Sequence, residues 1–182
     1  MDAAGALRRP EAAGRARPRP LFHADRRVLH VDAQIVIGPA RAGEQQPLTR
    51  IAHAAKRHWG YPEEWIRSWS ADLTVSADAI AHDPVYCARS GGDIAGFYAL
   101  SVEGDVAELE HMWVEPGYMG LGVGRALFEH AKDTAARLGC GRMRIASDPN
   151  ALGFYERMGA RRVGAVASTP APRILPLLEL AL

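Results

Sequence analysis

The fold of this chain is decided by the stretch LEHMWVEPGYMGLGVGRALF, which covers residues 109–128. An apolar, strand-like run ends at Pro116, and a helix-like run begins at the closely spaced glycines Gly120, Gly122 and Gly124. A glycine turn between a strand and a helix aims backbone N–H groups and the positive end of the helix dipole at one point, which suits a phosphate. The stretch therefore predicts a turn that binds an anion.

Two common phosphate-binding motifs do not fit this turn. A P-loop ends in Gly-Lys-Ser/Thr, but Gly124 is followed by Arg125 and Ala126, so the phosphate-binding lysine is missing. A dinucleotide fingerprint spaces its glycines as GxGxxG, and Arg125 stands where the third glycine belongs. The residues around the glycines therefore exclude both motifs.

The segments on either side of the turn predict a mixed sheet. Three strand-like runs precede it, separated by short turns that contain glycine, which is typical of an antiparallel meander. They cover Val85–Arg89, Ile94–Val102 and Val106–Val114. An amphipathic helix follows the turn, Gly139 is placed to end that helix, and the strand Arg142–Ser147 comes next. A strand, a helix and a strand in this order predict one parallel pair.

The residues before the meander predict one strand and three helices. Alternation of apolar residues indicates the strand, and apolar residues at three- and four-residue steps indicate the longest helix. Proline with acids at a helix start, and a serine N-cap, indicate the two shorter helices. The elements are expected over Val31–Ile37, where Gly38-Pro39 ends the strand, over Gly43–Trp59, from Pro62 with Trp65, Ile66 and Trp69 buried, and over Ala77–Ala81 after Ser76.

The C-terminal part predicts a short helix and a strand pair. Asp148 and Pro149 supply an N-cap and a first-turn proline, and the helix runs to Met158, before Gly159. A Ser/Thr/Pro-rich loop then separates two strand-like runs. These runs cover Arg161–Val166 and Ile174–Leu180.

Length and composition fit one folded domain with an unusual N-terminal segment. The chain has 182 residues and a formal net charge of +1, which gives no reason to expect nucleic acid or a membrane as a partner. Residues 1–27 hold seven arginines and three acids but few aliphatic residues. We therefore expect a disordered Arg/Ala/Pro-rich extension, followed by a single domain over residues 28–182.

The cysteines and the hydropathy pattern bound the environment of the protein. Cys87 and Cys140 form no CxxC pair and lack neighbouring histidines in metal-ligand spacing, so neither a disulfide framework nor a metal site is predicted. The expected location is the reducing cytoplasm. No apolar run approaches the roughly 20 residues that a membrane-spanning helix needs.

Two segments resemble the signatures of one family. Residues 114–127 are similar to the pyrophosphate loop of the GCN5-related N-acetyltransferase (GNAT) superfamily, and NALGFYERMGA, residues 150–160, resembles its second signature. The order of elements from Val31 to Leu180 also matches. The resemblance implies an α/β (α+β) fold with a mixed, mainly antiparallel central sheet. It further implies helices on both faces and one parallel β-α-β crossover at an acetyl-CoA site.

The resemblance also implies which residues hold acetyl-CoA as co-substrate. Met119 replaces the Arg or Gln with which the family pattern usually opens, so we expect weaker or differently distributed phosphate binding. Alternatives are a plain tight turn for the glycines, a core role for Trp113 and a capping role for Asn150. The implied cofactor-binding residues are Met112, Trp113, Val114, Met119, Gly120, Leu121, Gly122, Val123, Gly124, Arg125, Asn150, Phe154 and Tyr155.

Acetyl transfer to an amine requires a proton acceptor, because an amine with a pKa near ~10 is almost fully protonated at neutral pH. Counted back from the glycines, Glu108 matches the glutamate base of the histone-acetylating members, and Glu110 is its close rival. Strand alternation places both on one side with Met112 and Val114, unless a bulge intervenes. A surface ion pair is the alternative for either glutamate. Tyr155 matches the tyrosine that would protonate the CoA thiolate, or is simply a buried aromatic.

The acceptor pocket is expected between the first two helices and the last hairpin. An aromatic wall there would suit a cationic amine. Aromatic residues at helical spacing also fit a core, and a histidine there also fits a helix cap. The candidate acceptor residues are His58, Trp59, Tyr61 and Tyr98.

Together these features imply an N-acetyltransferase that moves an acetyl group from acetyl-CoA to a primary amine by direct attack in a ternary complex. A non-catalytic CoA or acyl-CoA sensor or interaction module is the alternative. A longer acyl group also fits, because the loop grips only the pyrophosphate. The acceptor stays open between a small amine, an aminoglycoside, an amino acid and a protein N-terminus. The apolar segment Ile174–Leu182 is compatible with a homodimer, although no sequence pattern indicates one.

Overall fold

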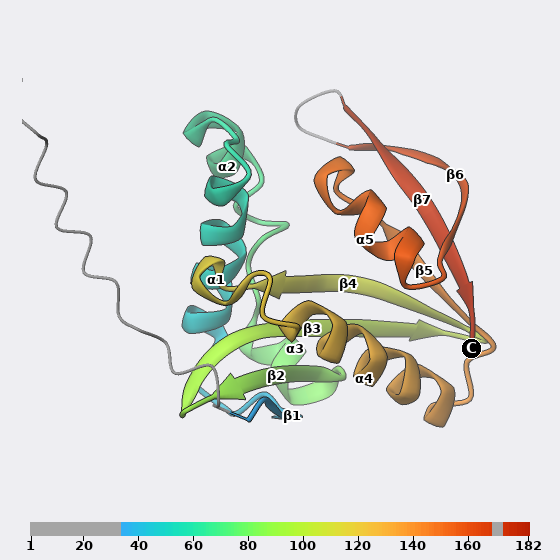
Figure 1. Ribbon diagram of the computed structural model, residues 1–182, viewed down its shortest axis with the longest axis horizontal. Coiled ribbons are helices and arrows are strands. Elements are labelled where there is room, and N and C mark those ends of the chain that lie inside the picture. Colours follow the sequence, from blue (N-terminus) through green and yellow to red (C-terminus); the bar gives the residue numbers. More distant parts are fainter. Residues whose placement is uncertain (1–33, 169–172) are drawn as a thin grey trace, which may run out of the picture. The chain divides into compact units, whose positions relative to one another are not determined.

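A seven-stranded sheet with one parallel pair organises the protein (Figure 1). The computed structural model describes residues 34–168 and 173–182. The strand order is β1-β2-β3-β4-β5-β7-β6, in which β4 and β5 run parallel and the other neighbours run antiparallel. The strands are β1 (Val36–Pro39), β2 (Val85–Ser90), β3 (Asp93–Glu103), β4 (Val106–Val114), β5 (Arg142–Ala146), β6 (Arg161–Ser168) and β7 (Arg173–Ala181).

Helices cover both faces of this sheet. On one face α1 and α2 bury Leu48 and Ile66 against β2 and β3. On the other face α4 and α5 bury Phe128 and Tyr155 against the sheet. The predicted fold class is therefore confirmed. The helices are α1 (Gln45–His58), α2 (Glu63–Ser68), α3 (Ala77–His82), α4 (Val123–Arg137) and α5 (Leu152–Arg157), with single 3-10 turns at η1 (Pro116–Tyr118) and η2 (Pro149–Ala151).

The local signals in the sequence place most helix ends correctly. Ser76 caps α3 by accepting a hydrogen bond from the Ala79 N–H, and Asp148 caps η2 by accepting one from the Asn150 N–H. Gly139 follows α4 with φ +87°, a left-handed conformation that glycine adopts easily. Such ends are predictable because they depend on neighbours within one helical turn.

The N-terminal elements differ from the prediction in two places. β1 begins at Val36 and continues through Gly38 and Pro39, which the sequence predicts as its end. β1 lies at the edge of the sheet and pairs with β2 alone, where a proline without an N–H donor is tolerated. Trp65, expected in a buried stripe, is 38% exposed. The predicted extension over residues 1–27 lies outside the described residues.

β4 stops pairing with β5 partway along its length. The parallel pairing covers Val106 to Glu108, although β4 continues to Val114. Opposite β3, Leu109 and His111 face the consecutive residues Leu100 and Ala99, so Glu110 is an extra residue that forms a β-bulge. The pocket described below lies between the separated parts of the two strands.

The bulge changes which side chains share a face. Leu109 belongs to the core under α4, and Met112 and Val114 pack against that same core. Glu108 alternates with Leu109 and therefore lies on the opposite face. A bulge was allowed for in the sequence-based prediction, and one is present. The prediction that Glu108 shares a side with Met112 and Val114 is therefore wrong.

Glycine on β3 allows β4 to approach closely near its end. A Cβ atom at Gly96 would lie 2.6 Å from the Trp113 carbonyl oxygen and 3.0 Å from Leu127 Cδ1. Contacts this short would displace backbone, so glycine is required at this position for the observed packing. Gly96 thereby supports the part of β4 that lines the pocket.

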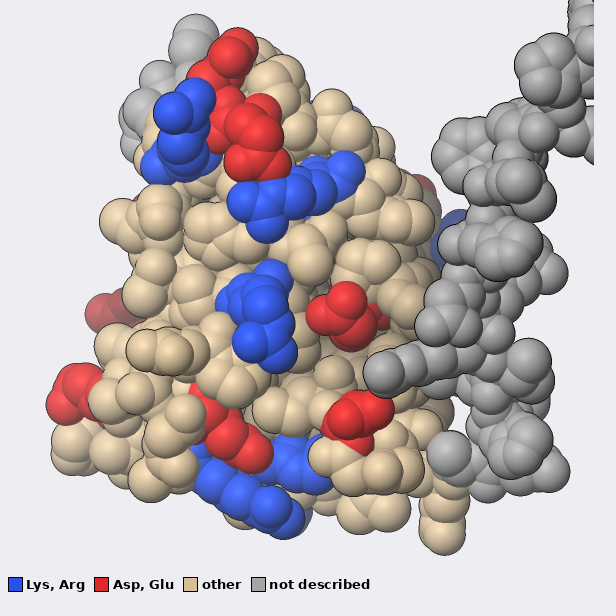
Figure 2. All heavy atoms as spheres, turned by 90° about the vertical axis from the view of Figure 1, so that its left-hand side faces the viewer, with Lys and Arg blue, Asp and Glu red and all other residues tan. Residues whose placement is uncertain are grey.

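The face of the protein shown in Figure 2 has mixed charge, and the described helices are too short or too polar to span a membrane. Figure 2 shows basic and acidic side chains next to one another on the face that it presents. Within residues 34–168 and 173–182, no helix is long and apolar enough to cross a membrane. Both cysteines are free and buried.

Candidate active site

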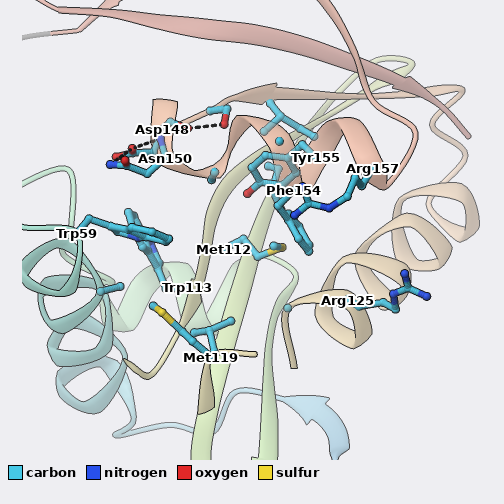
Figure 3. Close-up of a pocket in the computed structure, with 18 of the residues that line it drawn as sticks. Trp59, Met112, Trp113, Met119, Arg125, Asp148, Asn150, Phe154, Tyr155 and Arg157 are labelled. Carbon is cyan, nitrogen blue, oxygen red and sulfur yellow. Dashed lines mark hydrogen bonds between the residues drawn. The ribbon is translucent and has the colours of Figure 1, made fainter. Parts of the chain in front are cut away.

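A pocket of about 540 Å³ opens between the diverging strands β4 and β5 (Figure 3). Its walls are formed by β4 (Leu109, Glu110 and residues 112–114), by the end of β5 with η2 and α5, and by the glycine turn before α4. Ala55 and Trp59 of α1 border it as well. The pocket therefore brings together segments predicted to bind the cofactor, to carry the chemistry and to bind the acceptor.

Most of the predicted cofactor residues line this pocket. Two do not: the side chain of Leu121 is 47% exposed, and Val123 is buried in the core under α4. Because the Val123 side chain is buried in the core, Val123 can contribute only backbone groups. The predicted residues that line the pocket are Met112, Trp113, Val114, Met119, Gly120, Gly122, Gly124, Arg125, Asn150, Phe154 and Tyr155.

The glycine turn leaves the start of α4 open. Gly120 and Gly122 have φ values of +80° and +84°, so these two positions need glycine for conformational reasons. Gly122 is the N-cap of α4, and no side chain caps the helix there. The first N–H groups of a helix lack partners inside the helix and carry partial positive charge. The turn can therefore hold an anion at the pocket.

Two arginines add positive charge on the same side of the pocket. Arg125 lies in the first turn of α4 and Arg157 at the end of α5, and both line the pocket. The Arg157 guanidinium lies over Gly153, where a Cβ would be 3.3 Å from Nη1. Figure 3 shows both arginines on the side of α4 and α5, and Met119 on the side of Trp113 and Trp59. Side-chain charge near the glycine turn thus comes from positions other than Met119.

The two candidate glutamates lie in different environments. Glu108 accepts a hydrogen bond from Arg144 Nη1 at 2.9 Å and does not line the pocket. Glu110, the bulge residue, lines the pocket, and Ser101 Oγ donates a hydrogen bond to its Oε1 at 2.7 Å. The bulge therefore brings Glu110 to the pocket while Glu108 stays in an ion pair.

Tyr155 lies in the pocket wall, enclosed by aromatic rings. Its ring contacts those of Phe128 and Phe154, with centroids 5.6 Å and 5.1 Å apart. Burial, with a smaller contribution from the charge of Asp148, raises the pKa of Tyr155. The phenol therefore stays protonated at neutral pH and can act as a proton donor.

The four candidate acceptor residues are separated by the fold. Trp59 lines the pocket, whereas His58 and Tyr61 do not. Tyr98 is fully buried beneath α4, where its hydroxyl contacts His130 Nδ1 at 2.8 Å and donates to Thr134 Oγ1 at 3.0 Å. Tyr98 is therefore a core residue, and its assignment to the acceptor pocket is wrong.

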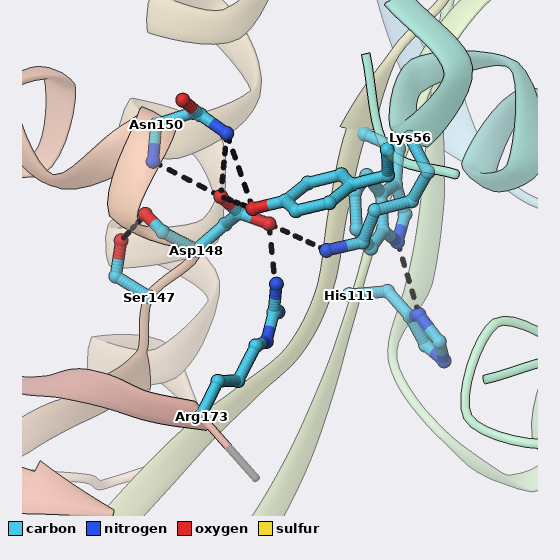
Figure 4. A network of polar contacts seen from close by, with 8 residues as sticks. Lys56, His111, Ser147, Asp148, Asn150 and Arg173 are labelled. Atoms are coloured by element: carbon cyan, nitrogen blue, oxygen red, sulfur yellow. Dashed lines mark hydrogen bonds and ion pairs between the residues drawn. The ribbon is translucent and has the colours of Figure 1, made fainter. Parts of the chain in front are cut away.

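A polar network surrounds Asp148 at the end of β5 (Figure 4). Lys56 Nζ donates to Asp148 Oδ2 at 2.5 Å, and Arg173 Nη2 lies 3.6 Å from the same oxygen. Tyr61 donates to Oδ1 at 3.0 Å, and Asn150 Nδ2 donates to the Tyr61 hydroxyl at 3.2 Å. Asn150 is thus engaged with Asp148 and Tyr61, and Asp148 joins α1, η2 and β7.

The charges in this network reflect burial and pairing. Burial lowers the pKa of Lys56, and its hydrogen bond to Asp148 acts in the opposite direction. Burial alone would raise the pKa of Asp148, but the hydrogen bond and charge of Lys56 outweigh it, so the pKa lies below its ordinary value. Asp148 is therefore ionised at neutral pH.

The aromatic wall already holds cations that belong to the protein. Lys56 Nζ lies 5.0, 5.1 and 5.2 Å from the ring centroids of Tyr61, Trp69 and Trp113. The Arg173 guanidinium lies 4.4 Å from the ring centroid of Trp69. The rings expected to receive a cationic amine thus contact Lys56 and Arg173 instead.

Trp113 is also fixed from its other side. Its indole N–H donates to His111 Nδ1 at 3.1 Å. Burial lowers the pKa of His111, which favours the neutral ring that can accept this bond. Within the described residues, no group of three or more His, Cys, Asp or Glu side chains is arranged to hold a metal ion.

A comparison with known protein families identifies the family of this chain. The sequence pattern described as Acetyltransferase (GNAT) family matches residues 48–160, which include the glycine turn and α5. The chain belongs to the GNAT acetyltransferase family. The resemblance drawn from the two sequence signatures is therefore confirmed.

Two N-acetyltransferases are similar to this chain over part of their length. The glucosamine 6-phosphate N-acetyltransferase of Trypanosoma brucei brucei is 30% identical over 84 residues, which are 42% of this chain and 57% of that protein. The N-alpha-acetyltransferase RimI of Mycobacterium tuberculosis is 34% identical over 91 residues, 47% of this chain and 57% of that protein. The chain spans just over half the length of these two relatives.

A solved N-acetyltransferase structure shows the same fold over nearly its whole length. The PaiA N-acetyltransferase of Thermoplasma acidophilum, in complex with coenzyme A, matches 82% of this chain and 99% of its own with a TM-score of 0.69. The sequence identity is 19%. At this identity the likeness concerns the fold.

Three residues near the GNAT pocket were missed as site residues. Asp148 was read only as a helix cap, although it also lines the pocket. Lys56 lies on the buried face of α1, four residues after the buried Ala52, and a lysine on an apolar face is a signal that could have been used. Arg173 lies beyond the matched range, at the start of β7, and gave no sequence signal.

Proposed function

We propose that this protein transfers an acetyl group from acetyl-CoA to a primary amine by direct attack in a ternary complex. One observation carries the proposal: the pocket between β4 and β5 brings the open start of α4, the free part of β4, Glu110 and Tyr155 to one place. The family and the coenzyme A held by the Thermoplasma relative support acetyl-CoA as co-substrate.

The elements of the pocket suit different parts of acetyl-CoA. The open N-terminus of α4 suits the pyrophosphate, and Arg125 and Arg157 add positive charge there. Beyond Glu108, β4 has no paired residues on β5, so backbone groups at residues 109–114 are available to the pantetheine arm. Backbone N–H groups there can also stabilise negative charge on the thioester carbonyl oxygen during attack.

Glu110 is the better placed of the two glutamates to take the proton. The amine nitrogen attacks the thioester carbonyl carbon only after losing a proton, which passes to the Glu110 carboxylate directly or through water. Ser101 orients that carboxylate without neutralising it. Glu108 is paired with Arg144 on the other face of the strand and is proposed to be structural.

The proposal is tested by CoA release from acetyl-CoA across a panel of small amines and peptides. The wild type is expected to release CoA with at least one amine, and Glu110→Gln to lower kcat/KM by roughly 100-fold, because a positioned base contributes on this order. Glu108→Gln is the matched control and should change kcat/KM little. Silence of the wild type across the panel despite tight CoA binding, or equal losses in both variants, would contradict the proposal.

Tyr155 is proposed as the acid that protonates the departing thiolate. When the tetrahedral intermediate collapses, the C–S bond breaks and the sulfur takes the phenolic proton. Tyr155→Phe keeps the ring and its contacts with Phe128 and Phe154 but removes that proton. We expect kcat to fall by roughly 100-fold with an unchanged affinity for acetyl-CoA. Equal kcat values for variant and wild type, measured under saturation with both substrates, would rule out this role.

A further inference from the structure

The network around Asp148 contains more positive than negative charge. Lys56 and Arg173 both face one oxygen of the single Asp148 carboxylate, at 2.5 Å and 3.6 Å. The three side chains are only 6%, 16% and 10% exposed, in the order Lys56, Arg173, Asp148. Two cations and one anion leave one unit of positive charge in excess, and water screens it poorly because the groups are buried. The region therefore attracts an anion.

Arg173 also has hydrogen-bond donors without acceptors. Its Nε and Nη1 atoms are buried and have no hydrogen-bond partner among the described residues. The 3.6 Å contact of Nη2 with Asp148 is longer than a hydrogen bond. A guanidinium does not lose its proton in proteins, and buried donors without acceptors are unfavourable. Arg173, unlike Lys56 with its 2.5 Å bond, is thus the cation with unused capacity.

This network adjoins the pocket at Asp148 and Trp113. Asp148 and Trp113 line the pocket, whereas Arg173 and Lys56 do not. Arg173 Nη2 lies 3.6 Å from the Asp148 carboxylate, and Lys56 Nζ lies 5.2 Å from the ring centroid of Trp113. Figure 4 shows Arg173 extending from β7 toward Asp148, and Lys56 approaching Asp148 from α1. The glycine turn lies at another wall of the pocket, next to α4. The excess charge is therefore separate from the site proposed for the pyrophosphate.

A purely cationic acceptor does not fit this arrangement. The faces of Tyr61, Trp69 and Trp113 already contact the two side-chain cations of the network. A second cation there would meet like charge and would leave the Arg173 donors unpaired. An acceptor with an oxyanion would instead match the charge and supply hydrogen-bond acceptors, and carboxylates and phosphates are the groups that guanidinium binds best.

We propose that the acceptor is an amine that also carries an oxyanion, a carboxylate or a phosphate, and that Arg173 binds this oxyanion. The inference rests on the proposed acetyl transfer and names the class of its acceptor. Lys56 keeps Asp148 ionised and in place, and Asp148 in turn orients Arg173. Arg173 is thus a specificity-determining residue, separate from Glu110 and Tyr155.

The test compares matched pairs of amines that differ only in the anionic group. One arm uses an amino acid and its carboxamide, and the other uses an aminoalkyl phosphate and the corresponding amino alcohol, so the arms distinguish carboxylate from phosphate. The wild type should prefer the anionic member of at least one pair. Arg173→Gln should lower kcat/KM for that member by roughly 10- to 100-fold, the usual loss for one charged hydrogen-bond partner. The neutral member and the KM for acetyl-CoA should change little.

Two further variants keep the test interpretable. Arg161→Gln removes an exposed arginine from β6, outside the pocket and the network, and should leave the preference intact. Arg173→Lys keeps the charge and should retain part of the preference if Arg173→Gln proves unstable. A wild type that does not distinguish the members of either pair would overturn the inference, as would an Arg173→Gln variant that slows both members equally.

Binding of the amines is measured in addition to turnover, so that failure of this inference can be distinguished from failure of the proposed function. Isothermal titration calorimetry of the CoA-loaded protein with the same pairs reports recognition of the oxyanion without chemistry. Tighter binding of an anionic member that Arg173→Gln abolishes would support the inference even if no amine were acetylated, in which case the proposed function fails alone. Acetylation with equal binding and equal rates within each pair would instead remove the inference and leave the function standing.

Discussion

An affinity for acetyl-CoA lowered by roughly 1000-fold is expected when Gly122 and Gly124 are both replaced by glutamate. Gly122 caps α4 at φ +84°, so any side chain there strains the turn. A unit charge about 4 Å from a phosphate costs from ~1 kcal/mol in bulk water to ~4 kcal/mol near a protein surface. The two carboxylates would also compete for the N–H groups at the helix start. Calorimetric titration with acetyl-CoA measures the effect.

The other end of the same helix supplies the matched control. Gly139 has φ +87°, almost the value at Gly122, and it does not line the pocket. Gly139→Glu therefore introduces similar strain and charge without approaching the proposed phosphate site, and its affinity for acetyl-CoA should match the wild type. A folded Gly122→Glu/Gly124→Glu variant that binds acetyl-CoA normally would show that the phosphates do not lie at the start of α4.

Lys56→Met is expected to lower the free energy of unfolding by roughly 3 kcal/mol, because it leaves the buried Asp148 carboxylate without its 2.5 Å partner. The Asp148 side chain is only 10% exposed, and Arg173 at 3.6 Å cannot replace that bond. For a chain of this size such a loss corresponds to a decrease in Tm of roughly 6–12 °C. Urea unfolding and thermal melts followed by circular dichroism measure both quantities.

Two variants test whether the loss comes from the unpaired charge. Lys132→Met removes a lysine that pairs with Glu129 at 2.9 Å on the surface of α4, and should cost no more than about 1 kcal/mol. The double variant Lys56→Met/Asp148→Asn has no unpaired charge at residue 148 and keeps a side chain that can cap η2. It should therefore recover part of the lost stability. A Lys56→Met variant no less stable than Lys132→Met would mean that the buried pair does not form in solution.

Much of the fold was predictable because its signals are local. The glycines of the turn, the Ser76 cap and the helix-ending Gly139 act on residues within one turn of the chain, and each was assigned correctly. The meander and the parallel pair followed from turn length and element order. The two family signatures were found for the same reason, since each is a short continuous segment.

The candidate site was only partly predictable. A β-bulge shifts the alternation of side chains along a strand by one residue, and the sequence does not show where the bulge lies. One extra residue at Glu110 reverses the faces of β4 and sends Glu108 into an ion pair with Arg144. Nothing in the sequence of β4 marks this bulge. Tyr98 shows a related limit, since an aromatic residue on β3 fits a pocket wall or the core under α4 equally well until the helix is placed.

The sequence by itself determined the glycine turn, the helix that follows it and the family to which they belong, because these depend on residues close together in the chain. The tertiary structure alone decided which glutamate reaches the pocket and which charges surround Asp148. Lys56 and Asp148 are 92 residues apart, and Arg173 approaches from the last strand. Their charges interact only once α1, η2 and β7 are packed together, because the attraction depends on distance in space and on the exclusion of water.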